Sequence, residues 1–108
     1  MSLSLLLVSA SAVAQLAAGS PVAQTSTTKS VAEFESCFVE RQASAVQPFW
    51  IVAYEDGVKI SNEGTTGVAD PWRVRFTQTA QGNRVQLLAT SSASADRTRL
   101  AEAVDRCS

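Results

Sequence analysis

Histidine is absent from the 108-residue chain, which excludes Ser-His and Cys-His catalytic pairs and His-containing metal sites. Carboxylates remain available for acid–base catalysis, at Glu33, Glu35, Glu40, Asp56, Glu63 and Asp70. The sequence also offers a Ser-Lys pair, because Lys59 and Ser61 lie two residues apart and share one face of a predicted strand. A neutral lysine requires burial, which an edge hairpin rarely provides, so this pair is a weak candidate.

A glycine-containing segment, Gly64-Thr65-Thr66-Gly67, has a composition that suits phosphate binding. It lacks the Gly-Lys-Ser/Thr ending of a P-loop and does not lie between a strand and a clear helix, so we expect an ordinary loop. The sequence therefore predicts no cofactor and no metal. It favours a protein without catalytic activity, and a small hydrolase or lyase that uses carboxylates is the alternative.

Cations and aromatic side chains are expected together on one face of a predicted sheet. Strand periodicity puts them on the outward side, at Trp50, Tyr54, Lys59, Arg73, Arg75 and Arg84. Such a face can dock a partner protein or an anionic polymer of the cell envelope through charge and stacking. In the competing interpretation, the arginines pair with Glu55, Glu63 or acids of the helices, and the face is merely solvated. The net charge of −1 does not favour nucleic acid as a partner.

Two cysteines, Cys37 and Cys107, enclose most of the foldable chain. Their separation is unlike the CxxC spacing of redox and zinc motifs. In an exported protein the two thiols are expected to form a disulfide, whereas in a reducing compartment they would be buried free thiols. We therefore predict a Cys37–Cys107 disulfide, provided that the chain is exported.

The N-terminus has the pattern of a signal peptide. No charged side chain occurs before Lys29, and an apolar core of Leu3, Leu5, Leu6, Leu7 and Val8 precedes several small residues. Ala12-Val13-Ala14 predicts cleavage before Gln15, with Ala18 or Ala23 as later alternatives. The apolar stretch is shorter than the ~20 residues of a spanning helix, so we expect no stable membrane span after cleavage. An uncleaved anchor or an ordinary buried helix is the rival interpretation.

The remaining chain predicts one domain at 30–108, after the leader (1–14) and a flexible polar spacer (15–29). Ser30 and Glu33 form a capping-box pattern before an amphipathic helix over about 31–43, which carries Cys37 inward. Two β-hairpins follow, one on each side of the irregular segment 62–71. Apolar residues at helical spacing predict a last helix over about 95–107.

These elements predict an α+β fold. A four-stranded antiparallel sheet made of two hairpins carries an N-terminal and a C-terminal helix on one face, and a disulfide joins the helices. How the two hairpins meet is left open by the sequence. We expect a periplasmic or secreted, non-catalytic binding or accessory protein of the cell envelope or secretome, for example an inhibitor of another exported protein.

Overall fold

A computed structural model of the chain describes residues 21–42, 48–64, 71–89 and 94–108. The elements follow one another as β1 (Ala23–Thr27), α3 (Val31–Gln42), β2 (Trp50–Tyr54), β3 (Gly57–Ser61), β4 (Trp72–Thr79), β5 (Gly82–Ala89) and α4 (Ser94–Cys107). The predicted leader (1–14) lies outside the described residues.

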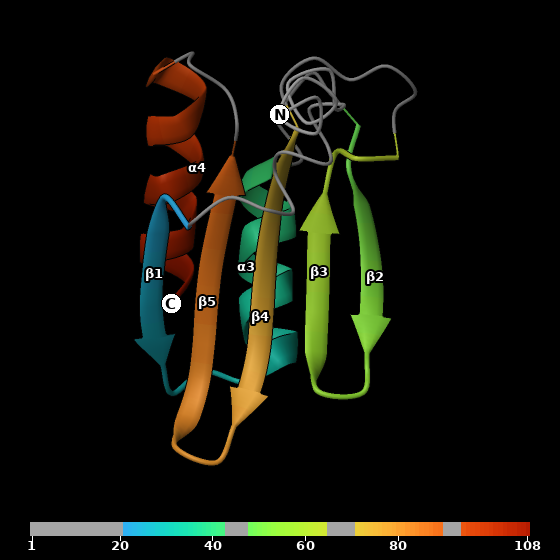
Figure 1. The fold of residues 1–108 in the computed structure, drawn as a ribbon, viewed down its shortest axis with the longest axis vertical. Helices are drawn as coiled ribbons and strands as arrows, with labels where there is room; N and C mark the ends of the chain where they lie inside the picture. Colours follow the sequence, from blue (N-terminus) through green and yellow to red (C-terminus); the bar gives the residue numbers. More distant parts are fainter. Residues whose placement is uncertain (1–20, 43–47, 65–70, 90–93) are drawn as a thin grey trace, which may run out of the picture.

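The sheet has five antiparallel strands in the order β1-β5-β4-β3-β2 (Figure 1). Both predicted hairpins, β2–β3 and β4–β5, are present. They meet through pairing of β3 with β4, which the sequence left open. The α+β class is confirmed, but the predicted number of four strands is wrong.

The additional strand, β1, comes from the segment predicted as a polar spacer. It pairs with β5 from Ala23↔Leu87 to Thr27↔Asn83, so α3 is not the first element of the fold. The strand has no apolar alternation, because threonine and serine fill most of its positions. Its inward-facing residues are Ala23, Thr25 and Thr27, and Thr27 is buried. Pairing with β5, rather than hydrophobic pattern, specifies this strand.

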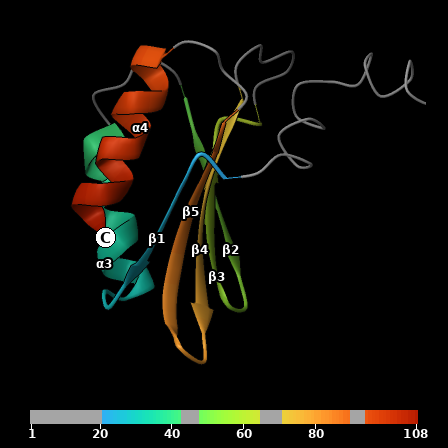
Figure 2. The same cartoon turned by 60° about the vertical axis from the view of Figure 1, so that its left-hand side comes forward.

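Both helices lie on the same side of the sheet, as predicted (Figure 2). The core between the two layers contains α3 and α4 side chains packed on the inward residues of β3, β4 and β5. Its largest fully buried members include Phe34, Phe38, Phe76, Ile60, Leu87 and Leu100. The Phe34 ring lies 5.8 Å from that of Phe38 and 5.4 Å from that of Phe76. These contacts hold α3 against the centre of the sheet.

The predicted capping box begins α3. The Glu33 amide donates to the Ser30 hydroxyl oxygen, and the Ser30 amide donates to the Glu33 carboxylate, both at 3.1 Å. The pKa of Glu33 is lowered mainly by the hydrogen bond from the Ser30 amide. The hydrogen bond with the Ser30 hydroxyl and the positive charge of Lys29 lower it further. Glu33 therefore serves as a charged helix cap.

The predicted disulfide joins Cys37 of α3 to Cys107 of α4, with Cα atoms 5.6 Å apart. Cys107 is fully buried at the last residue of α4, so the bridge holds the end of this helix in the core. A disulfide is typical of proteins in oxidising compartments. Neither α3 nor α4 is long and apolar enough to cross a membrane.

Candidate interaction surface

The sheet has an outer face, on the side opposite the helices. Residues paired across an antiparallel sheet project to the same side, so the register defines this face. One row joins Trp50, Ser61 and Arg73, and the next joins Val52, Lys59 and Arg75. A third row runs from Tyr54 through Gly57 and Thr77 to Arg84. All of the residues predicted for a partner-binding surface, Trp50, Tyr54, Lys59, Arg73, Arg75 and Arg84, thus share the outer face.

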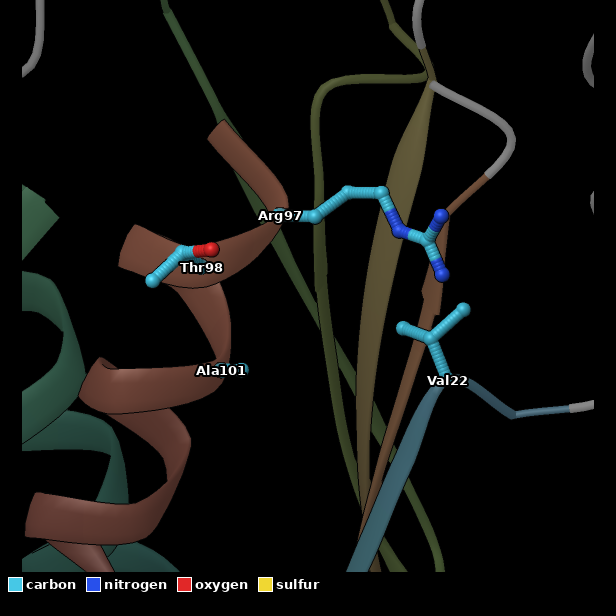
Figure 3. Close-up of a pocket in the computed structure, with 4 residues that line it drawn as sticks. All are labelled: Val22, Arg97, Thr98 and Ala101. Atoms are coloured by element: carbon cyan, nitrogen blue, oxygen red, sulfur yellow. The ribbon is translucent and has the colours of Figure 1, made fainter. Parts of the chain in front are cut away.

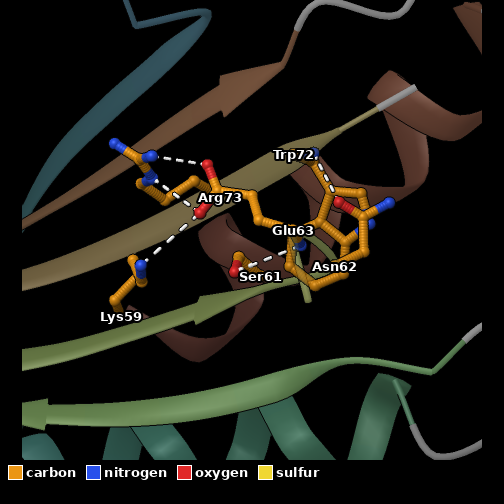
Figure 4. Close-up of polar contacts among 6 residues, drawn as sticks. All are labelled: Lys59, Ser61, Asn62, Glu63, Trp72 and Arg73. Atoms are coloured by element: carbon orange, nitrogen blue, oxygen red, sulfur yellow. Dashed lines mark hydrogen bonds and ion pairs between the residues drawn. The ribbon is translucent and has the colours of Figure 1, made fainter. Parts of the chain in front are cut away.

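Glu63 neutralises part of this face (Figure 4). Its carboxylate accepts hydrogen bonds from both the Nε and the Nη2 atoms of Arg73, and one of its oxygens lies 3.5 Å from the Lys59 Nζ atom. The Glu63 side chain is only 10% exposed, so solvent screens these ion pairs less than it screens pairs at an open surface. Arg73 therefore pairs with Glu63, one of the acids that the competing interpretation names, and Lys59 shares the same carboxylate.

The turn after β3 positions Glu63. The Asn62 side chain is buried, and its oxygen accepts a 2.8 Å hydrogen bond from the amide of Trp72 at the start of β4. Gly64 follows, and a Cβ atom at this position would lie 2.7 Å from the Trp50 ring. Glycine thus allows the turn to pack against the indole at the edge of the outer face.

Arg75 and Arg84 differ from the two paired cations. The guanidinium of Arg75 lies 5.8 Å from the centre of the Tyr54 ring, within the range of a cation–π contact. Within the described residues, neither Arg75 nor Arg84 forms an ion pair, and both side chains are exposed. The groups of the outer face that a partner could reach therefore include two guanidinium groups. Arg75 lies over the aromatic and aliphatic strip of β2, and Arg84 lies on β5, three strands away from β2.

Lys59 and Ser61, the candidate Ser-Lys pair, each contact Glu63. The Lys59 amine faces the Glu63 carboxylate, and the buried Ser61 hydroxyl oxygen accepts a hydrogen bond from the Glu63 amide. Glu33 and Glu40 both line a hollow beside α3, yet seven residues separate them, which is ~10 Å along a helix. Asp70 and the segment 65–70 lie outside the described residues.

Another hollow lies between the start of β1 and α4 (Figure 3). Val22, Arg97, Thr98 and Ala101 line it, and the Arg97 side chain extends from α4 toward Val22. Among the described residues that line it, Arg97 is the one with a charged side chain. Within the four described ranges, no three His, Cys, Asp or Glu side chains form a cluster that could hold a metal ion.

No protein-family model, curated protein or solved structure matches the chain.

The sequence predicts which cations and aromatic residues lie on the outer face, but it does not separate the cations that are paired from those that are accessible. The division between paired Lys59 and Arg73 and accessible Arg75 and Arg84 depends on the β3–β4 pairing, which brings Glu63 beside Arg73. The sequence names Glu63 among the acids that could pair with the arginines, but it does not single out Arg73. The packing of Gly64 on Trp50 had no sequence signal.

Proposed function

We propose that this chain is an exported, non-catalytic binding protein that docks a partner protein on the outer face of its sheet. One observation carries the proposal: both described helices cover the opposite side, while accessible guanidinium groups and aromatic rings share the outer side. Aromatic residues and arginine are enriched at protein interfaces, where they provide stacking, apolar area and directional hydrogen bonds.

A protein partner is favoured over an anionic polymer by the charge of the face. Glu63 pairs with both Lys59 and Arg73 and offsets one of their two positive charges, so the cations without an ion pair among the described residues of this face are Arg75 and Arg84. Binding to a polyanion normally uses a longer run of unpaired cations. The apolar residues of β2 lie beside the guanidinium of Arg75 and on the same face as Arg84, and they would suit a surface that combines carboxylates with apolar side chains.

The proposed location is the periplasm or the extracellular medium. The Cys37–Cys107 disulfide supports it, as does the leader-like sequence that ends before Gln15. Cleavage there would leave β1 intact, whereas cleavage after Ala23 would remove the first residue of this strand.

Intact mass spectrometry tests the export step. We expect the protein made with its own N-terminus in a bacterial host to lose residues 1–14 and to contain no thiol that reacts before reduction. A full-length mass together with two reactive thiols under denaturing conditions, in the absence of reductant, would contradict both export and oxidation.

Charge reversal tests the binding surface. In the variant Arg75→Glu/Arg84→Glu, we expect capture of partner proteins from an envelope extract to fall by about tenfold or more, because two guanidinium contacts become repulsive. The matched control is Arg97→Glu/Arg106→Glu, which makes the same change of charge at exposed positions of α4. The capture of each protein is quantified by mass spectrometry.

The amount of protein captured is compared among the wild type, the Arg75/Arg84 variant and the α4 control. Equal capture by the wild type and the Arg75/Arg84 variant would overturn the proposal, as would an equal loss in the α4 control. Heparin serves as a polyanion probe. If heparin binds in an Arg75- and Arg84-dependent manner and no protein does, the polymer is the partner and the protein-docking proposal is wrong. Arg73 is left unchanged, because its reversal would also break the Glu63 ion pair.

A further inference from the structure

We propose that β2 pairs antiparallel with β2 of a second copy of this chain, with a two-fold axis at Val52. All residues of β2 are exposed, and Trp50, Ile51, Val52 and Tyr54 are each 42–44% accessible. Figure 1 shows this strand at the edge of the sheet, beyond the width that α3 and α4 cover. The proposal depends on the strand edge and not on the docking of a partner at the outer face.

The backbone of β2 has hydrogen-bonding groups on its outer edge that no other described strand pairs with. The hairpin turn consists of Glu55 and Asp56, so the flanking residues Tyr54 and Gly57 form a hydrogen-bonded pair. Hydrogen-bonded and non-hydrogen-bonded pairs alternate along an antiparallel ladder. The amides and carbonyls of Ile51 and Ala53 therefore point away from β3, toward the open edge.

The sequence of β2 matches its own reverse in side-chain type. In a two-fold arrangement about Val52, Trp50 lies opposite Tyr54 of the second copy, and Ile51 lies opposite Ala53. Aromatic thus meets aromatic, aliphatic meets aliphatic, and Val52 meets its own counterpart. The same register pairs Ile51 with Ala53, whose backbone groups point outward, so side chains and hydrogen bonds select one alignment. An isologous contact of this kind closes after two copies.

β2 lacks lysine, proline and a bulge, which are features that keep an edge strand from pairing with a strand of another chain. The other edge, β1, has the polar sequence Ala-Gln-Thr-Ser-Thr. In the proposed dimer, Lys59 and its counterpart are separated by three strand spacings, which is ~14 Å and beyond the screening length at physiological salt. The cations of the outer face therefore do not oppose the pairing.

The contact is small, because the strand has five residues. An interface that buries less than ~1,200 Å² in total is typical of weak association, so we expect a dissociation constant on the order of 10–100 µM.

Sedimentation velocity measures this association on the purified protein expressed with its own N-terminus. We expect the sedimentation coefficient to rise from monomer to dimer between about 1 and about 500 µM, as this dissociation constant requires. Val52→Lys places two like charges opposite each other at the axis, so we expect a monomer throughout this range. Val22→Lys is the matched control at the other edge of the sheet, where the valine is similarly exposed, and it should dimerise like the wild type.

Cysteine cross-linking tests the register separately. Cα atoms of a non-hydrogen-bonded pair lie ~4.5 Å apart, within the range that a disulfide spans, so two Val52→Cys chains should cross-link at the axis. Ile51→Cys is the control, because Ile51 is equally exposed but lies opposite Ala53 and not opposite itself. With oxidised glutathione as the oxidant, we expect at least tenfold faster dimer formation for Val52→Cys. A mixture of Ile51→Cys with Ala53→Cys should form the heterodimer.

Four results would overturn the proposal. They are a monomer at every concentration, a dimer that persists in Val52→Lys, loss of the dimer in Val22→Lys, and equal cross-linking of Val52→Cys and Ile51→Cys. Circular dichroism of each variant shows whether it has folded, and the cross-linking result applies even if Val52→Lys does not fold.

Discussion

Breaking the Cys37–Cys107 disulfide is expected to lower the free energy of unfolding by roughly 4 kcal/mol, because the bond closes a loop of 70 residues. Such a loss is a large share of the ~5–15 kcal/mol that stabilises a typical domain. For a domain of this size it corresponds to a fall of about 15–30 °C in the melting temperature. The helices would then rely on packing alone, and α4 contributes few large apolar side chains besides Leu100 and Val104.

Thermal unfolding of the wild type with and without reductant measures this effect, since the two samples differ only in the bond. The control is the variant Cys37→Ala/Cys107→Ala, whose melting temperature should not respond to the reductant. It should unfold close to the reduced wild type, apart from about 1 kcal/mol for the smaller buried side chain at Cys107. A reductant effect below about 1 kcal/mol would show that the bond does not stabilise the fold appreciably.

Gly57→Ala is expected to destabilise the protein by about 3 kcal/mol or more. Gly57 begins β3, and a Cβ atom built there would lie 1.8 Å from the backbone oxygen of Phe76. This oxygen belongs to the central strand β4, so the clash can be relieved only by moving two strands apart. Urea unfolding of the wild type and the variant gives the difference in free energy.

Gly64→Ala is the matched control for this substitution. Its added Cβ atom would lie 2.7 Å from the Trp50 ring, a side chain that is partly exposed and free to shift. Alanine also reduces the conformational entropy of the unfolded chain, so we expect a net change within about 1 kcal/mol. If the two variants lost equal stability, the close approach of Gly57 to Phe76 would not explain the requirement for glycine.

The sequence predicted the elements that have strong local signals. The capping box at Ser30 and Glu33 begins α3, and the alternation of Trp72, Val74 and Phe76 identifies the inward face of β4. The two hairpins follow from turn residues between apolar strands. The disulfide was predicted from cysteine spacing and the expectation of export, and its geometry then agrees with helices on one side of the sheet.

Features that depend on contacts distant in sequence could not be predicted in this way. Strand β1 has a polar sequence and forms because β5 provides a paired edge. The pairing of β3 with β4 joins the two hairpins, and neither turn encodes it. Glu63 becomes the partner of Arg73 only after this pairing. The sequence therefore predicted which residues share the outer face but not which of its charges are accessible.

The position of β1 has a consequence for the order in which the chain folds. Its residues pair with β5 residues that lie 56 to 64 positions later, from Thr27↔Asn83 to Ala23↔Leu87, and the disulfide joins residues 70 positions apart. The first strand thus has no place to dock until nearly the whole chain has been synthesised. If the chain is exported as proposed, the segment that contains β1 crosses the membrane before β5 does, and β1 stays unpaired until the last hairpin has also crossed. The fold can be completed, and the Cys37–Cys107 disulfide can form, only after the last helix, α4, has been synthesised.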